Sequence, residues 1–213
     1  MPKAGPRQYV SQLRGQSAEA TRLRILEAAK SMFARRGIDD TTVAEIAERA
    51  GVAGSTIYAL YKSKEGILRA LMKAALFGPR FDKARTRLQG VTDPIELLML
   101  TAQVSRAIYE GETSELGIIR GVSAFSPALR KLEQEFEKIR LDMQEERITL
   151  LFKDGKQRKG LTLKDARRIL WMYTSRDVYR MLVHDGGWTP DRYQQWLSDT
   201  LTNALARTND KAG

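Results

Sequence analysis

Residues 41–68 read TTVAEIAERAGVAGSTIYALYKSKEGIL, and this stretch decides the fold of the first third of the chain. Thr42 and Glu45 have the Thr-x-x-Glu spacing of a capping box, in which two side chains bind free backbone N–H groups where a helix begins. Apolar residues at helical spacing follow, and Gly51 ends the helix because glycine adopts the left-handed conformation at no steric cost. A second short helix is predicted over 55–61, so the stretch is interpreted as a helix-turn-helix.

Two further helices are predicted on either side of this motif. The first spans 17–36, where an apolar stripe with helical spacing ends at Gly37. The second begins after Ser63, which is placed to cap it. Gly78-Pro79 should break this helix before a second segment over 80–88, because proline lacks the N–H that a helix interior needs.

The same residues resemble a known family, the TetR family of transcriptional regulators, over roughly Arg22–Leu68. A match of this length in one register is far more specific than a short motif. The residues that carry the resemblance are Arg22, Ile25-Leu26, Ala28-Ala29, Phe33, Gly37, Thr41, Ile46-Ala47, Ala50-Gly51-Val52, Thr56, Tyr58, Tyr61, Lys64 and Leu68.

The resemblance implies an all-α fold of about nine helices. Residues 17–75 would form a helix-turn-helix DNA-binding domain, with the motif itself at about 42–61. Residues 76–213 would form a larger helical domain for regulation, ligand binding and dimerisation. Residues 1–16 have no clear period, and we expect a flexible basic arm with Lys3, Arg7 and Arg14 as its charges. The arm is either a solvated tail or a segment that reaches a DNA groove.

Carried over position by position, the resemblance places DNA contacts near the second helix of the motif, which enters the major groove. Hydroxyl groups can donate to phosphates or base edges, a lysine can neutralise a phosphate, and a leucine can contact a thymine methyl group. Each of these side chains also has a structural alternative in helix capping or packing. The predicted DNA-binding residues are Thr42, Ser55, Thr56, Tyr58, Leu60 and Lys64.

This sequence departs from the commoner family pattern at Ala53, Ser55, Ala59 and Leu60. No side chain over 53–61 can make a bidentate contact with guanine or adenine. We therefore expect specificity to come from hydroxyl and backbone N–H groups, methyl contacts and the shape of the DNA.

The charge distribution favours the same end of the chain. Residues 1–75 carry 13 lysines and arginines against 7 aspartates and glutamates, a net charge of +6, whereas residues 76–213 carry 23 against 19, a net of +4. A positive field concentrated around the helix-turn-helix suits a partner made of phosphates.

Composition excludes several other classes of protein. The chain has no cysteine, which removes disulfides, thiol catalysis and cysteine metal sites, and its single histidine leaves no histidine pair. We expect no metal, no cofactor and no catalytic residue, and hence no enzyme. No apolar run is long enough to span a membrane and no signal peptide is recognisable, so we expect a cytoplasmic, nucleoid-associated protein without a membrane partner.

Helix start signals divide the remainder of the chain. Asp93-Pro94, Ser126-Pro127, Thr162 and Thr189-Pro190 each place a capping residue or a first-turn proline before an apolar pattern. The predicted helices span about 93–110, 115–125, 127–153, 162–184 and 189–207. No alternating strand pattern interrupts them, so the fold class is all-α.

The last two predicted helices have the composition of a dimer interface. Both carry more apolar surface than one small domain needs to bury, and the resemblance implies that these helices pair two subunits. A symmetric homodimer would bind an inverted-repeat operator in double-stranded DNA. The predicted interface residues are Trp171, Val178, Leu182, Tyr193, Trp196, Leu197 and Leu201.

The helices between the two ends would enclose a cavity for a small-molecule inducer, again as the resemblance implies. Arg176 is the informative residue, because it is a charge in an apolar helix: it either joins a buried ion pair or an interface contact, or it anchors an acidic ligand. The others are either cavity lining or plain core. The candidate ligand-binding residues are Met99, Tyr109, Phe125, Phe136, Met143, Met172, Arg176 and Tyr179.

These observations predict a sequence-specific DNA-binding regulator of transcription, a repressor that leaves its operator when a ligand binds. Two alternatives stay open at this stage. A non-specific architectural DNA-binding protein would show little preference for an operator over bulk DNA. A nucleic-acid enzyme would need clustered carboxylates or a nucleophile beside a base, and the sequence offers neither pattern.

Overall fold

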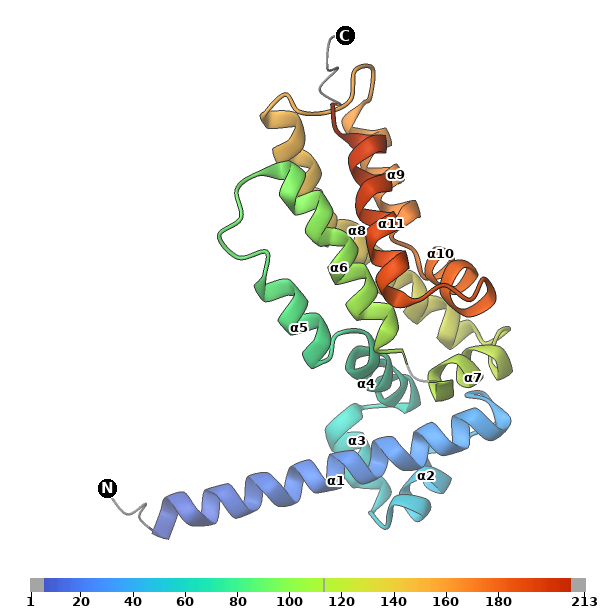
Figure 1. Cartoon of the computed structure of the whole chain (residues 1–213). Coiled ribbons are helices and arrows are strands. Elements are labelled where there is room, and N and C mark those ends of the chain that lie inside the picture. Colours follow the sequence, from blue (N-terminus) through green and yellow to red (C-terminus); the bar gives the residue numbers. More distant parts are fainter. Residues whose placement is uncertain (1–5, 113, 208–213) are drawn as a thin grey trace. The chain divides into compact units, whose positions relative to one another are not determined.

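The computed structural model describes residues 6–112 and 114–207, with side chains over 16–112 and 116–207. These residues form eleven α-helices and one π-helical segment, and none of them forms a β-strand beyond the isolated bridge Gln157–Ala206. The predicted all-α fold is therefore confirmed. The elements are α1 Pro6–Arg36, α2 Val43–Ala50, α3 Gly54–Tyr61, α4 Lys64–Leu76, α5 Pro79–Thr86, α6 Pro94–Glu110, α7 Ser114–Val122, α8 Pro127–Lys153, α9 Leu163–Tyr173, α10 Arg176–Tyr179, η1 Arg180–Asp185 and α11 Pro190–Leu205 (Figure 1).

The chain divides into two compact units. Residues 1–74 and 113–132 form the first, which we call the head, and residues 75–112 and 133–213 form the second, which we call the body. The division falls close to the predicted boundary after residue 75. Segment 113–132, which includes α7, groups with the head rather than with the sequence around it.

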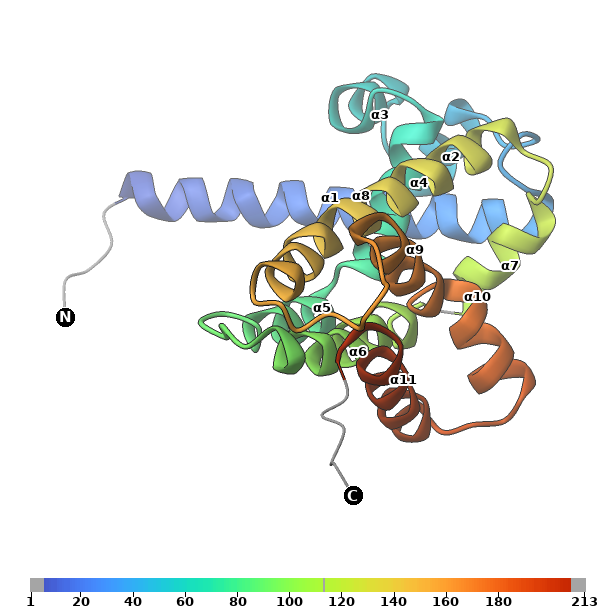
Figure 2. The same ribbon diagram turned by 90° about the horizontal axis from the view of Figure 1, so that it is seen from above.

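The head is built on α1, and Figure 2 shows this long helix passing the compact group of α2, α3 and α4. Its core consists of fully buried apolar side chains, among them Ile25, Phe33, Ile46 and Ile57. Such side chains contribute roughly 1.5–3 kcal/mol each when they leave water, which holds these short helices together.

Helix α7 packs against α1, and the turn after α1 is fitted to it. Gly37 has φ +85°, and a Cβ there would lie 3.3 Å from a methyl carbon of Val122, so both its conformation and its surroundings favour glycine. The N–H of Ile38 donates to the Ser123 hydroxyl at 3.0 Å. The Ser126 hydroxyl donates to Asp39 at 2.9 Å. These contacts explain why segment 113–132 belongs to the head.

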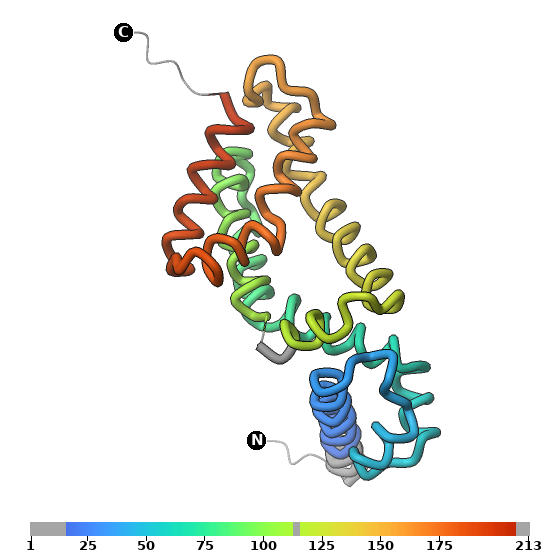
Figure 3. Tube along the Cα trace, turned by 90° about the vertical axis from the view of Figure 1, so that its right-hand side faces the viewer, coloured from blue at the N-terminus to red at the C-terminus, as the bar shows by residue number. Residues whose placement is uncertain are grey.

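The body is organised around α6, whose side chains are buried on most faces: Leu97, Leu98, Thr101, Ala102, Val104, Ser105, Ile108 and Tyr109. Helix α11 runs beside α6 and also contacts α9, as Figure 3 shows. Tyr193 of α11 is fully buried, and its hydroxyl lies 3.0 Å from that of Ser105. Asp93, Thr162 and Thr189 cap their helices as predicted, each accepting a bond from the N–H three residues on.

Two predictions about the course of the helices were wrong. Residues from Pro6 onward belong to α1, so the predicted arm is helical over 6–16, with proline at the helix start where its missing N–H costs nothing. Residues 1–5, with Lys3, lie outside the described part. The helix predicted over 162–184 ends at Thr174, whose hydroxyl donates to the Leu170 carbonyl, and Ser175 caps α10. Serine and threonine hydroxyls compete for backbone groups in this way, and such bonds were not visible in the apolar pattern.

Candidate nucleic-acid interface and ligand cavity

The start of α2 is fixed by local hydrogen bonds. The Thr42 hydroxyl accepts a bond from the N–H of Glu45 at 3.3 Å and donates to the Glu45 carboxylate at 2.7 Å. The carboxylate also accepts the N–H of Thr42 at 2.8 Å and pairs with Arg36 at 2.6 Å. These bonds lower the pKa of Glu45 from 4.5 to about 2, the Thr42 hydroxyl contributing most. The predicted capping box is confirmed.

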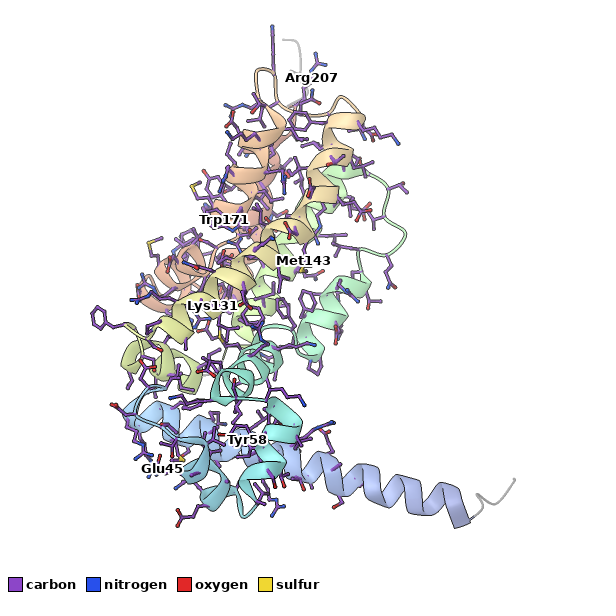
Figure 4. The ribbon with its side chains drawn as sticks, turned by 180° about the vertical axis from the view of Figure 1, so that it is seen from behind. Glu45, Tyr58, Lys131, Met143, Trp171 and Arg207 are labelled. Carbon is purple, nitrogen blue, oxygen red and sulfur yellow. The ribbon has the colours of Figure 1, made fainter. Side chains whose placement is uncertain are left out.

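Helix α3 exposes some of the predicted DNA contacts and buries Ile57. Ile57 is fully buried, whereas Tyr58 is 54% exposed and Ser55 is exposed. Thr56 and Leu60 are half-buried. Figure 4 places the labelled Tyr58 on α3 and Glu45 on α2, within the same group of short helices. The helix therefore packs on one face and leaves the face with Ser55 and Tyr58 open to a partner.

Two of the predicted DNA contacts also have partners within the head. The hydroxyl of Thr42 is engaged in the capping box, which supports the structural alternative for this residue. The Lys64 ammonium donates to the carbonyl of Asp39 at 3.1 Å. An ammonium group has three N–H donors, so Lys64 keeps two for a phosphate. Ser63 caps α4 through the N–H of Gly66, and its bond to Glu65 is the main cause of that residue's lowered pKa.

Lys62 is a candidate contact that the sequence did not indicate. It is exposed, follows α3 directly and has φ 67°, the only positive φ of a non-glycine residue in the described part of the chain. This conformation costs a residue with a side chain about 1 kcal/mol or more. Glycine is the usual residue at such a helix end, so a lysine here was not predictable from turn rules.

The candidate ligand residues differ in their exposure. Phe125 is 88% exposed and belongs to the head, while Met99 and Met172 are about half exposed on the body at 49% and 48%. The remaining aromatic candidates, Phe136, Tyr109 and Tyr179, are buried in the body. Burial raises the pKa of the hydroxyls of Tyr109 and Tyr179. These three pack against neighbouring rings and carbonyls, as core residues do.

Arg176 has a structural partner. Its Nε donates to both carboxylate oxygens of Glu112, at 2.9 and 3.0 Å. Of the two alternatives that the sequence left open, the structure shows the ion pair. The pairing raises the pKa of Arg176 against the opposing effect of its burial.

Met143 lines a small cavity in the body. The space is about 20 Å³, which is room for one water molecule. Figure 4 shows Met143 on α8 and Trp171 on the neighbouring α9. Six of the nine lining residues have polar side chains, which sequence reasoning missed because these residues come from distant parts of the chain. The lining residues are Thr101, Val104, Ser105, Ile108, Arg140, Met143, Gln144, Arg147 and Thr174.

A second, wider pocket of about 550 Å³ shares Met143 and Arg147 with this cavity. It is bounded by the end of α5, the segment that leads to α6, and α8. Its size is that of ordinary small-molecule sites. The apolar part of its lining is Leu88, Val91, Leu97, Met143 and Leu150.

The predicted dimer residues separate into two groups. Tyr193, Leu197 and Leu201 are fully buried within the body, so their side chains belong to its own core and offer no surface to a partner. This corrects their assignment to an interface. Trp171, Val178, Leu182 and Trp196 are half-buried, and the Trp196 ring contacts those of Tyr173 and Trp188.

No group of three or more histidine, cysteine, aspartate or glutamate side chains among the described residues is arranged to hold a metal ion. None of the helices described is both long and apolar enough to cross a membrane.

Comparison with known proteins gives a consistent match for the head. Residues 25–71 match the family model for bacterial regulatory proteins of the tetR family. The regulator TtgR of Pseudomonas putida is 42% identical over 57 residues, which are 27% of this chain and 27% of that protein. The alignment thus spans about a quarter of that relative. The fatty acid metabolism regulator protein of Bacillus subtilis is 26% identical over 165 residues, 76% of this chain and 84% of that protein.

Solved structures extend the likeness in fold to the whole chain. NalD, the secondary repressor of a multidrug efflux pump in Pseudomonas aeruginosa, has a TM-score of 0.66 at 23% identity over 89% of this chain and 98% of its own. FadR of Bacillus subtilis, solved with stearoyl-CoA, has a TM-score of 0.62 at 23% identity over 84% and 96%. At such identities the likeness shows the fold.

Proposed function

We propose, on the premise of the match of residues 25–71 to the tetR family model, that the protein is a sequence-specific regulator of transcription. It would act as a repressor that leaves its operator when the body binds a small molecule. The observation that carries the proposal is the α2–α3 pair, in which a capping box fixes the start of α2 while α3 buries Ile57 and leaves Ser55 and Tyr58 exposed.

The DNA contacts follow from this geometry. The second helix of such a motif enters the major groove, where hydroxyl groups can reach base edges or phosphates. Ser55, Thr56, Tyr58 and Leu60 lie on α3 in this position. Lys64 would add a phosphate contact through the donors that Asp39 leaves free, and Lys62 would add another. The hydroxyl of Thr42 would chiefly hold the helix start.

The body would join two copies of the chain through the edge formed by α9 to α11. This edge carries the half-buried Trp171 and Trp196 and the more exposed Met172 and Met181, at 48% and 50%. Large aromatic and methionine side chains at a surface are typical of the centre of an interface. A two-fold symmetric dimer would present two α3 helices to an inverted-repeat operator in double-stranded DNA.

A ligand for the body is proposed from the cavity and from the relatives. FadR of Bacillus subtilis was solved with stearoyl-CoA, and SmeT was solved with triclosan. A molecule that prefers one arrangement of the body would change operator affinity by its differential affinity for that arrangement. Such a regulator would work in the cytoplasm, on the nucleoid.

The test is a selection of bound DNA. Purified protein is incubated with sheared genomic DNA of its source, and the retained fragments are sequenced. Enrichment of inverted repeats, bound by two chains per repeat with at least about a thousandfold preference over bulk DNA, supports the proposal. Uniform retention of all fragments instead indicates an architectural DNA-binding protein and contradicts it.

The selected fragment then tests the site itself. Lys64→Ala should weaken binding to all sequences and lower the slope of log K against log salt by about one unit, because one phosphate contact is lost. Lys73→Ala, a change of an exposed lysine on the same helix, is the matched control and should leave the slope unchanged. Equal slopes for Lys64→Ala and wild type would remove Lys64 from the interface.

A further inference from the structure

Helix α8 carries two arginines seven residues apart that line the same cavity, Arg140 and Arg147. Both terminal nitrogens of Arg140 are bonded within the body, while its buried Nε has no partner among the described residues. One of its terminal nitrogens donates to the Trp171 carbonyl at 2.6 Å and to the Thr174 hydroxyl at 2.8 Å, and the other pairs with Glu137. These bonds satisfy backbone and hydroxyl groups at the end of α9, where a helix leaves carbonyls without partners. Arg140 therefore has a structural role.

Arg147 has no comparable set of partners. One terminal nitrogen donates to the hydroxyl of Thr101 at 3.2 Å, and within the described residues no carboxylate forms a salt bridge with the guanidinium. Burial lowers the pKa of Arg147, and the charge of the exposed Glu146 offsets this only in part. A cation that has lost water without gaining a carboxylate is costly, so it attracts an anion from solution.

The neighbouring Gln144 shows that protein atoms alone do not satisfy every polar group at the cavity. It is 5% exposed, its Nε2 donates to the Thr174 hydroxyl at 2.7 Å, and its Oε1 has no protein partner among the described residues. The amide cannot usefully turn over, because the Thr174 hydroxyl already donates to the Leu170 carbonyl at 2.7 Å. A water molecule fits the cavity of about 20 Å³ and can supply the missing donor.

The wider pocket could hold the apolar part of a ligand. Arg147 and Met143 line both the small cavity and the pocket of about 550 Å³, so the Arg147 side chain borders both spaces. The rest of the pocket is lined by apolar side chains, among them Leu97 and Leu150, and by the polar side chains Arg85, Gln89 and Glu146. A molecule that fills this pocket would place an apolar body against these side chains and one end against Arg147.

We propose that the body binds an amphipathic organic acid, with its anionic end on Arg147 and its apolar body in the pocket lined by Leu97 and Leu150. The inference rests on the proposed function only for its regulatory meaning, because binding can be measured without DNA. The competing explanation is that Arg147 simply reaches bulk water through the open pocket. That explanation predicts no preference for a charged head group.

The test compares probes of one chain length that differ in the head group. Decanoate, decanol, decyltrimethylammonium and decanoyl-CoA are titrated calorimetrically into the full-length protein below their micelle-forming concentrations. We expect decanoate to bind about tenfold or more tightly than decanol, the worth of a charge-assisted hydrogen bond. The ammonium probe should bind worst. The thioester probe separates a free acid from an acyl-CoA, because its carbonyl carries no charge to meet Arg147.

Variants assign the preference to one residue. Arg147→Met should bind decanoate and decanol equally, whereas Arg147→Lys should keep a reduced preference because the positive charge stays. Lys138→Met, which removes an exposed cation from the same helix, is the matched control and should behave as wild type. Melting curves of each variant without probe establish that it is folded.

Several outcomes would overturn the inference. For the wild type, these are equal affinity for decanoate and decanol, or no measurable binding of decanoate. For Arg147→Met, they are a preference for decanoate that persists, or binding of decanoyl-CoA that is tighter than that of decanoate and unchanged by the substitution. Operator binding is measured separately on the same variants without probe. If the variants and wild type bind the operator equally while the preference for decanoate is absent, the ligand inference fails and the proposed function stands. If the wild type does not bind the operator but prefers decanoate, the proposed function fails and the ligand inference stands.

Discussion

The head and the body differ in how many sequence positions separate their functional residues from the residues to which these are hydrogen-bonded. In the head, Thr42 is bonded to Glu45 and Ser63 to Gly66, each pair three residues apart. In the body, the residues around the cavity are joined over 30 positions between Gln144 and Thr174 and over 88 between Ser105 and Tyr193. The proposed DNA-facing surface is thus encoded in short stretches, whereas the proposed ligand cavity exists only once the helices have packed.

The relatives show the same contrast. Identity with TtgR is 42% over a segment of 57 residues, while identity with the fatty acid regulator over most of both chains is 26%. If the head binds DNA as proposed, it must fit the one geometry of the major groove, which restrains its short helices. The body would have to fit its own ligand, and volume-conserving changes in a packed core are tolerated. The three predictions below test whether the head is the more rigidly specified unit.

The largest effect is expected at Gly66, at the junction of α3 and α4. A Cβ there would lie 1.8 Å from the carbonyl oxygen of Tyr61, which is far inside contact distance. Because the obstacle is backbone, it can only be relieved by moving the two helices apart. Gly66→Ala should lower the free energy of unfolding by about 4 kcal/mol or more, in the range of the severest single substitutions. Urea denaturation monitored by circular dichroism measures it.

Gly54→Ala is the control for this experiment. Gly54 begins α3, has no atom within 4 Å of a built Cβ and has no positive φ. Alanine there should leave stability unchanged or raise it by up to about 1 kcal/mol, because alanine restricts the unfolded chain. If Gly66→Ala changes stability as little as Gly54→Ala does, the junction of α3 and α4 is not tightly constrained. The head would then not be more rigidly specified than the body.

An intermediate effect is expected in the body, and it separates its two cavity arginines. Arg140→Met removes bonds to a carbonyl, a hydroxyl and Glu137, and should cost about 3 kcal/mol of unfolding free energy. Arg147→Met is the same substitution seven residues along α8 and should cost less than about 1 kcal/mol, because it removes a poorly paired cation. Equal costs for both variants would mean that Arg147 also serves the fold.

The parts of the molecule that the sequence predicted are those set by neighbouring residues. The capping residues Thr42, Asp93, Thr162 and Thr189 needed only a polar side chain three positions before an N–H group. The same reasoning could not find Arg147 as a cavity residue, because a charged residue on a long helix usually faces solvent. Its burial depends on the packing of α8 against α6, which no local pattern records.

The errors have the same origin. Tyr193, Leu197 and Leu201 form an apolar stripe that suited an interface, yet all three are fully buried within the body, where α11 contacts α6 and α9. An apolar stripe shows that a helix face is covered and does not show by what. Likewise, the break of the helix predicted over 162–184 follows from hydroxyl groups at Thr174 and Ser175 that bond to the backbone, and their effect depends on the surrounding polar cluster.

The smallest effect is expected for the pH dependence of the head, through Glu45. Its pKa is lowered from 4.5 to about 2 by bonds from Thr42 and Arg36 that exist only in the folded protein. A carboxyl with a depressed folded-state pKa stabilises the fold above its unfolded pKa, and this contribution is lost as pH falls from about 4.5 toward 2. The difference in unfolding free energy between wild type and Glu45→Gln should therefore be largest above pH 4.5 and should shrink over that window.

Urea denaturation of both proteins at a series of pH values measures this difference, in which the other carboxyls of the chain cancel. Glu48→Gln, at an exposed position on the same helix, is the control for removing one carboxylate from α2. Because Glu45 is at the surface, salt should reduce the pH-dependent part further, since exposed ion pairs are screened. A difference that is constant from neutral pH down to 2 would show that the Glu45 carboxylate is not held by the capping box in solution. The short-range bonds would then determine the fold of the head less strongly than the long-range bonds determine the fold of the body.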